Sequence, residues 1–155
     1  MNDTSPQAPP VFGQHLPDTS RSLPIALLRA RENIMTPIRK MLAGAGVTEQ
    51  QWRVLRILHE GGVMEPQDVA RGACLIMPSL TRIVQGLERR GFVQRSAHPS
   101  DRRKHLLRIT ADGRAVIDRN IAESNQIAAD IAARYGPEKL AQLLDLLGDL
   151  SELEQ

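Results

Sequence analysis

The sequence contains few aromatic residues and no long hydrophobic run. Aromatic residues make up 3% of its 155 positions, so we expect an aliphatic and mainly helical core. No apolar stretch approaches the roughly 20 residues that a membrane span needs. The N-terminal segment has neither the basic region nor the apolar region of a secretion signal. These absences predict a cytoplasmic protein with no membrane association.

Patterns typical of enzymes and metal proteins are also missing. The single cysteine, Cys74, excludes an intrachain disulfide. The four histidines lack the spacing of a metal site or a catalytic triad, and no glycine-rich phosphate loop is present. We therefore expect no catalytic residues, no metal and no cofactor. Turnover of an aromatic acid by the pure protein would contradict this expectation.

The sequence does contain an uneven distribution of charge. The formal net charge is only +2, but residues 82–104 hold seven basic and two acidic residues. Residues 111–155 hold four basic and nine acidic residues. This asymmetry favours a basic face for a polyanion and an acidic region held away from it, although a solvated charged surface gives a milder version of the same pattern.

The N-terminal third predicts a tail followed by two helices. Residues 1–22 hold four of the ten prolines and little apolar content, which indicates a flexible tail. Apolar residues at helical spacing predict a helix over about residues 23–43, with a kink or a break at Pro37. The segment from Thr48 to Gly62 begins with a capping-box pattern and places Trp52 on a buried stripe.

Residues 66–91 predict two short helices joined by a tight connection. Proline can begin each helix, at Pro66 and Pro78, and Gly91 ends the second. The second helix has an apolar stripe on one side and four polar side chains away from it, namely Ser79, Thr81, Arg82 and Gln85. This is the pattern of a helix-turn-helix, whose second helix reads DNA. Any helical hairpin with a solvent-exposed polar face has a similar pattern.

A basic hairpin directly follows the second helix. In "SAHPSDRRKHLLRITADG", residues 96–113, the consecutive bases Arg102, Arg103 and Lys104 lie between two strand-like segments. A helix-turn-helix with a basic hairpin is a winged helix, and arginine suits the phosphate backbone and the minor groove. Asp101 would hold a neighbouring arginine in position. We expect the hairpin tip to contact DNA.

The predicted fold class is mainly α, a winged helix-turn-helix with a small β-hairpin wing and flanking dimerisation helices. The winged helix covers about residues 48–110, and the dimerisation helices cover about 23–43 and 111–152 within a domain of residues 23–155. Thr110 caps the first C-terminal helix, and Pro137 begins the second, which is rich in leucine. Because the outer helices carry apolar stripes, we expect a homodimer.

The chain resembles the MarR family of dimeric winged-helix regulators over about residues 23–152. The resemblance rests on "VTEQQWRVLRIL", "PSLTRIVQGLERRGFVQR", "DRRKHLLRITADG" and the two closing helices. Within the family, "ALLRARENIM", "TEQQWRVLRIL" and "ACLIMPSLT" resemble regulators of homoprotocatechuate (4-hydroxyphenylacetate) degradation. The family implies a palindromic double-stranded operator and a pocket for a small aromatic carboxylic acid that releases the DNA. Its DNA-reading pattern carries over to Ser79, Thr81, Arg82 and Gln85, and its wing pattern to Asp101, Arg102, Arg103 and Lys104.

Four residues are candidates for the aromatic-acid pocket. Arg31 and Arg53 offer forked donors for a carboxylate, Trp52 offers a flat wall for a ring, and His59 could meet a hydroxyl. The alternative is structural: Trp52 belongs to the core, and the arginines are solvated or paired with Glu32 and Glu49.

Two further functions remain open from the sequence. A redox-responsive regulator would sense through Cys74, but its apolar neighbours predict a small buried hydrophobic residue rather than a reactive thiol. A ligand-independent DNA-binding protein would carry the same wing.

Overall fold

The computed structural model describes residues 18–153. These divide into two units between Thr36 and Pro37, so the described parts are residues 18–36 and 37–153. The described part of the first unit contains the 3-10 helix η1 (Thr19–Arg21) and the beginning of α1 (Leu23–Ala45). Hydrogen bonds from the side chain and backbone of Ser20 hold the pKa of Asp18 below its usual range. The predicted tail covers residues 1–22, and residues 1–17 of it lie outside the described residues.

Helix α1 continues through Pro37, so of the kink or break predicted there, the break is absent. Proline lacks the N–H that would donate to the carbonyl of Asn33. One residue earlier, the Thr36 hydroxyl donates to the Glu32 carbonyl at 2.9 Å. Beyond the proline, Met41 and Leu42 are buried, and tertiary packing of this kind stabilises a helix more than propensity does.

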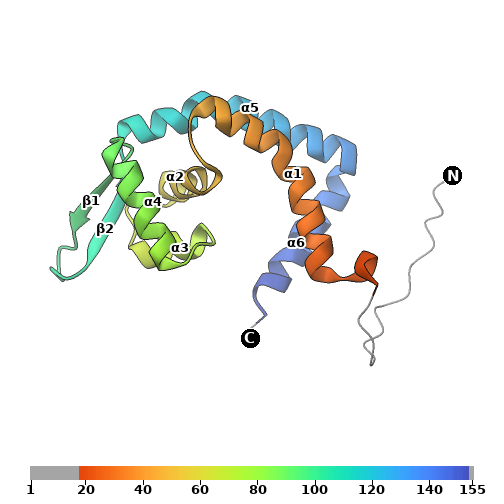
Figure 1. Cartoon of the computed structure of the whole chain (residues 1–155), viewed down its shortest axis with the longest axis horizontal. Helices are drawn as coiled ribbons and strands as arrows, with labels where there is room; N and C mark the ends of the chain where they lie inside the picture. Colours follow the sequence, from red (N-terminus) through yellow and green to blue (C-terminus); the bar gives the residue numbers. More distant parts are fainter. Residues whose placement is uncertain (1–17, 154–155) are drawn as a thin grey trace. The chain divides into compact units, whose positions relative to one another are not determined.

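The second unit contains the remaining elements (Figure 1). They are α2 (Glu49–Gly61), α3 (Pro66–Gly72), α4 (Met77–Arg89), β1 (Val93–Ala97), β2 (His105–Ile109), α5 (Ala111–Tyr135) and α6 (Pro137–Ser151). Helices α2, α3 and α4 pack on one another and on the hairpin, while α5 packs on α2 and α6. The predicted fold class, a winged helix-turn-helix with flanking helices, is confirmed.

Local sequence signals set the boundaries of the helix-turn-helix elements. The Thr48 hydroxyl accepts from the Gln51 N–H at 3.2 Å and the Gln51 side chain accepts from the Thr48 N–H at 3.1 Å, which confirms the capping box. Gly91 has a φ of +72°, a conformation that favours glycine, and its N–H donates to the Glu88 carbonyl at 2.9 Å. This turn ends α4 and sends the chain into β1.

The hairpin is joined to the helical core by strand register and by side-chain burial. Val93 pairs with Ile109 at the open end, and Ala97 pairs with His105 next to the connecting loop. Leu107 also forms an isolated bridge with Met64, just before α3. The largest fully buried side chains come from α2, α3, α4 and β2: Val54, Leu55, Leu58, Val69, Leu80, Val84, Leu87 and Leu107. Each contributes about 1.5–3 kcal/mol on burial, so the wing and the helix-turn-helix share one core.

The prediction that Cys74, in the connection between α3 and α4, is buried is wrong. The residue is exposed and has a positive φ of 51°, so it is not the buried hydrophobic residue that its apolar neighbours predicted. The chain turns at this point, and the turn directs the side chain outward while Ala73 is buried.

Candidate DNA-binding surface and ligand cleft

Helix α4 separates an apolar face from a polar one. Its buried residues, Leu80, Val84 and Leu87, pack into the core. Arg82 and Gln85 lie on the opposite side, where both are exposed and neither has a hydrogen-bond or ion-pair partner among residues 18–153. Unpartnered guanidinium and amide groups on one helix face are suited to base edges in the major groove.

The other two predicted α4 residues are less available as donors. Ser79 is half-buried. Thr81 is exposed, but its hydroxyl donates to the Met77 carbonyl at 3.0 Å, within the same helix. Sequence reasoning missed Arg89, which is exposed and follows Arg82 by seven residues, and that helical spacing is the signal that finds it.

The wing carries its charges on a short loop between β1 and β2. The Arg103 side chain is 93% exposed, and Arg102 is exposed without a partner among the described residues. The carboxylate of Asp101 accepts from the Arg103 backbone N–H at 2.9 Å, and its oxygen lies 3.5 Å from the Arg103 Nε. This contact restrains the loop and leaves most of the guanidinium directed to solvent.

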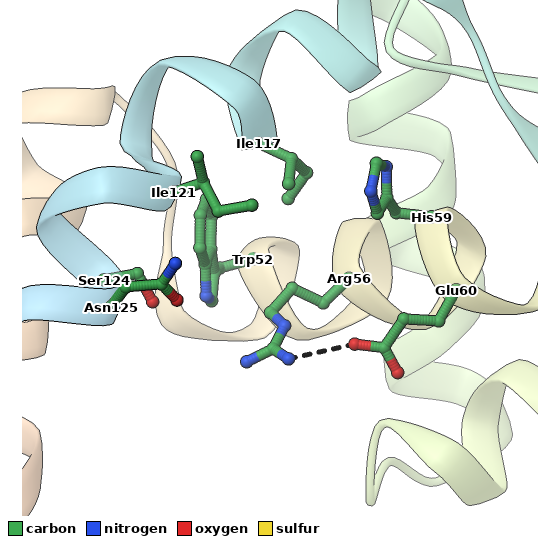
Figure 2. Close-up of a pocket in the computed structure, with 8 residues that line it drawn as sticks. All are labelled: Trp52, Arg56, His59, Glu60, Ile117, Ile121, Ser124 and Asn125. Carbon is green, nitrogen blue, oxygen red and sulfur yellow. Dashed lines mark hydrogen bonds and ion pairs between the residues drawn. The ribbon is translucent and has the colours of Figure 1, made fainter. Parts of the chain in front are cut away.

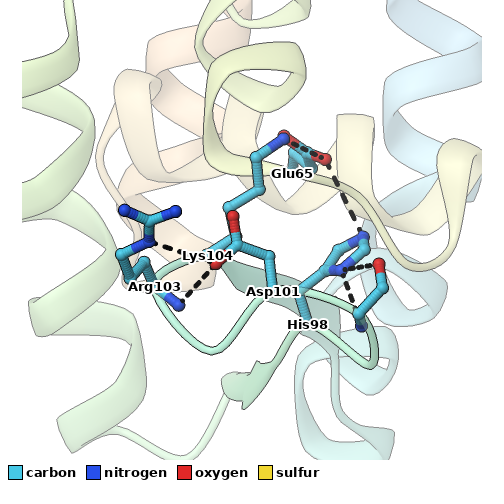
Figure 3. A network of polar contacts seen from close by, with 6 residues as sticks. Glu65, His98, Asp101, Arg103 and Lys104 are labelled. Atoms are coloured by element: carbon cyan, nitrogen blue, oxygen red, sulfur yellow. Dashed lines mark hydrogen bonds and ion pairs between the residues drawn. The ribbon is translucent and has the colours of Figure 1, made fainter.

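Lys104 differs from its arginine neighbours because it is paired with Glu65 (Figure 3). Its Nζ lies 3.2 and 3.3 Å from the two carboxylate oxygens of Glu65, the residue that precedes α3. The same carboxylate lies 4.0 Å from Nε2 of His98, whose Nδ1 accepts from the Ser100 N–H at 3.2 Å. Sequence reasoning missed Glu65, since it stands 39 positions before Lys104 and no local pattern joins them.

A cleft of about 140 Å³ lies between α2 and α5 (Figure 2). Helix α2 contributes Trp52, Arg56, His59 and Glu60, and α5 contributes Ile117, Ile121, Ser124 and Asn125. Each set recurs at i, i+4, i+7 and i+8, the spacing of one helix face. The cleft therefore has an aromatic and aliphatic wall beside a few polar groups, as small-molecule sites do.

The polar groups of the cleft differ in how well they are satisfied. Arg56 donates to Glu60 at 2.9 Å in an exposed pair one helical turn apart. The Nδ1 atom of His59 is buried and has no hydrogen-bond partner among the described residues. A buried polar atom without a partner is unfavourable, so a ligand or a water that reaches Nδ1 would be stabilised there.

The four predicted pocket residues do not all meet in this cleft. Trp52 and His59 line it, but Arg53 does not. Arg53 is half-buried, with an Nε that is buried and unpartnered among the described residues. Being one residue after Trp52, it points about 100° away around the helix, whereas Arg56 shares the Trp52 face. Arg31 lies in the first unit, 3.4 Å from Glu32, as the structural alternative predicted.

Comparison with known proteins identifies the family. Residues 47–105, from just before α2 to the first residue of β2, match the family model described as MarR family. Over 86% of its length, the chain is 38% identical to the HTH-type transcriptional regulator FarR of Neisseria gonorrhoeae, of which it covers 91%. The chain belongs to the MarR family. The resemblance seen in the helix-turn-helix, the wing and the closing helices is thereby confirmed.

Two other MarR-family relatives bear on function. The homoprotocatechuate degradative operon repressor of Escherichia coli is 39% identical over 85% of this chain and 89% of the relative. The structure of NadR in complex with 4-hydroxyphenylacetate is 37% identical, with a TM-score of 0.79 over 94% of this chain and 99% of NadR. The narrower resemblance to regulators of homoprotocatechuate degradation is also confirmed.

The described residues contain neither a membrane span nor a metal cluster. No helix between residues 18 and 153 has the length and apolar character to cross a bilayer. Within the same range, His, Cys, Asp and Glu side chains form no group of three that could hold a metal ion.

Proposed function

We propose that this MarR-family protein is a sequence-specific transcriptional repressor of genes for the breakdown of aromatic compounds. It binds a palindromic operator as a homodimer. The observation that carries the proposal is the surface formed by α4 and the wing, where Arg82, Gln85 and Arg103 extend into solvent from a rigid core. The relative that represses a degradative operon supports the target class.

In the proposed complex, α4 lies in the major groove and the wing lies along the neighbouring backbone and minor groove. Arg82 and Gln85 contact base edges, with Ser79 and Thr81 beside them at the N-terminal end of α4. Arg102 and Arg103 contact phosphates or the minor groove, and Asp101 keeps Arg103 in position. Lys104 contributes less than Arg102, because a phosphate must compete with Glu65 for its ammonium group.

The proposed effector is a small hydroxylated aromatic carboxylic acid bound in the cleft between α2 and α5. Trp52 packs against the ring, Arg56 pairs with the carboxylate, and His59 meets the hydroxyl. Glu60 occupies one donor of Arg56 and places a negative charge beside the bound carboxylate, so E60Q should raise the affinity for the acid. The complex of NadR with 4-hydroxyphenylacetate supports this ligand class.

The position of α2 explains how the effector would weaken DNA binding. Helix α2 forms one wall of the cleft and also packs on α3, α4 and β2. A ligand that changes the distance between α2 and α5 therefore moves the DNA-reading elements with α2. A dimer on DNA needs its two reading helices about 34–36 Å apart, so a ligand that prefers another spacing lowers affinity without touching DNA. A preference of about 1–3 kcal/mol gives roughly 5- to 150-fold coupling.

The proposed sequence-specific DNA binding is tested by selecting duplexes from a random pool. The affinity of the protein is then measured for the selected duplex and for a scrambled one. Specific binding should exceed non-specific binding by at least ~10³ at physiological salt. Arg82→Ala should reduce this ratio, whereas Arg119→Ala, which removes an exposed arginine of α5, should leave it unchanged. Equal affinity for selected and scrambled duplexes would favour a sequence-tolerant architectural protein.

The exposure of Cys74 gives the redox alternative a concrete test. A protein that senses through this thiol loses operator affinity on peroxide treatment, and Cys74→Ser abolishes the loss. A protein controlled by the aromatic acid keeps its affinity after peroxide.

A further inference from the structure

The N-terminal end of α4 presents apolar side chains to solvent. Ile76, the N-cap residue of this helix, is 70% exposed, more than any other large apolar side chain of the described residues. Met77, the first residue of α4, is 40% exposed. These two neighbouring side chains form a small apolar surface at the start of a helix whose later exposed residues are polar.

The same end of α4 offers few hydrogen-bond donors. The hydroxyl of Thr81 donates to the Met77 carbonyl at 3.0 Å, so its methyl group is the part left for an external contact. The exposed residues of α4 therefore differ in character along its length. It is apolar at Ile76 and Met77 and polar at Arg82 and Gln85, which have no partners among residues 18–153.

We infer that Ile76, supported by Met77, determines specificity by packing against the C5-methyl group of thymine in the operator. The inference rests on the proposed DNA-binding function and names one component of its readout. In the major groove, the thymine methyl is the apolar group that a base pair presents. The N-terminal residues of a recognition helix reach the base edges most directly, and Ile76 occupies that end of α4.

The charge of the neighbouring residues indicates that Ile76 contacts DNA rather than the surface of a second protein. Arg82 and Arg89 lie on the exposed side of the same helix, and Arg102 and Arg103 lie on the wing that follows. Residues 82–104 hold seven basic and two acidic residues, which suits a polyanion. A protein partner would also have to compensate this excess of positive charge.

The test uses a duplex that the protein itself selects from a random pool. Each thymine is replaced in turn by deoxyuridine, which removes the methyl group and keeps base pairing. At one or more thymines in each half-site, wild-type protein should lose about fourfold in affinity, the effect of burying one methyl group. Ile76→Ala should bind the thymine and uracil duplexes equally. Val63→Ala, which shortens a 57% exposed side chain outside α4, should keep the wild-type discrimination.

Three results would overturn the inference. The first is wild-type affinity that no uracil substitution changes. The second is an Ile76→Ala variant that still discriminates thymine from uracil as wild type does. The third is a change in oligomeric state on Ile76→Ala, since that would assign the side chain to a protein contact. Failure to select any sequence would instead contradict the proposed function itself.

Discussion

Gly113 joins helix α5 to the wing, and replacing it with alanine tests how tightly the two are joined. A Cβ at this position would collide with the carbonyl oxygen of Phe92 and lie 2.7 Å from Cγ1 of Ile109. The Phe92 carbonyl accepts from the Thr110 N–H at 3.0 Å, so it cannot rotate away without breaking this hydrogen bond to the N-cap residue of α5. In an open helix, Gly→Ala is favourable by about 1 kcal/mol, whereas overpacking costs typically 1–3 kcal/mol or more. Because the clash is with backbone, we expect a net loss of about 2 kcal/mol in the free energy of unfolding.

Thermal and chemical denaturation at matched protein concentration measure this loss. A destabilisation of about 2 kcal/mol lowers Tm by roughly 4–8 °C in a protein of this size. Gly86→Ala is the control, since its Cβ would meet no atom closer than 3.8 Å, and it should raise stability by up to about 1 kcal/mol. If Gly113→Ala were as stable as wild type, the close contact between α5 and the start of β1 would be refuted.

The remaining predictions concern the wing and the assembly. Arg103→Ala should weaken operator binding by about 1–3 kcal/mol without loss of folding, because the side chain is 93% exposed; wild-type affinity at matched salt would remove Arg103 from the interface. Arg102→Ala should reduce the slope of log DNA affinity against log salt concentration by about 1. Lys104→Met should reduce this slope by less, because Glu65 already neutralises Lys104. Equal changes in slope for the two variants would show that the ion pair between Glu65 and Lys104 opens freely on DNA. Leu146→Lys, at a side chain 60% exposed in one chain, should convert a dimer to a monomer in light scattering, and an unchanged dimer would exclude this face of α6 from the interface.

Local signals were sufficient for the elements and their boundaries. Thr48 with Gln51 set the start of α2, Thr110 caps α5 as expected, and Gly91 ends the turn after α4. These signals act over three or four residues, so they can be read from sequence without tertiary information. Pro37 is the exception, because burial of residues farther along α1 supports a helix that the proline alone would end.

The candidate site depended on contacts that sequence separation conceals. The pair between Glu65 and Lys104 joins residues 39 positions apart, and nothing near either residue signals it. The sequence alone could have identified Arg56 rather than Arg53 as a residue of the cleft, since only Arg56 shares the helical face of Trp52. The exposure of Cys74 follows from a turn of positive φ, which the surrounding apolar residues did not indicate.

The central claim is that an aromatic acid in the α2–α5 cleft and DNA on the α4–wing surface oppose each other. Calorimetric titration of 4-hydroxyphenylacetate into the free protein and into its complex with the selected duplex measures this coupling. Because coupling is reciprocal, the acid should bind the complex more weakly, by the same factor by which it lowers DNA affinity, roughly 5- to 150-fold. Arg56→Gln should weaken binding of the acid in the free protein. Equal affinities of the acid for free protein and complex would contradict the account.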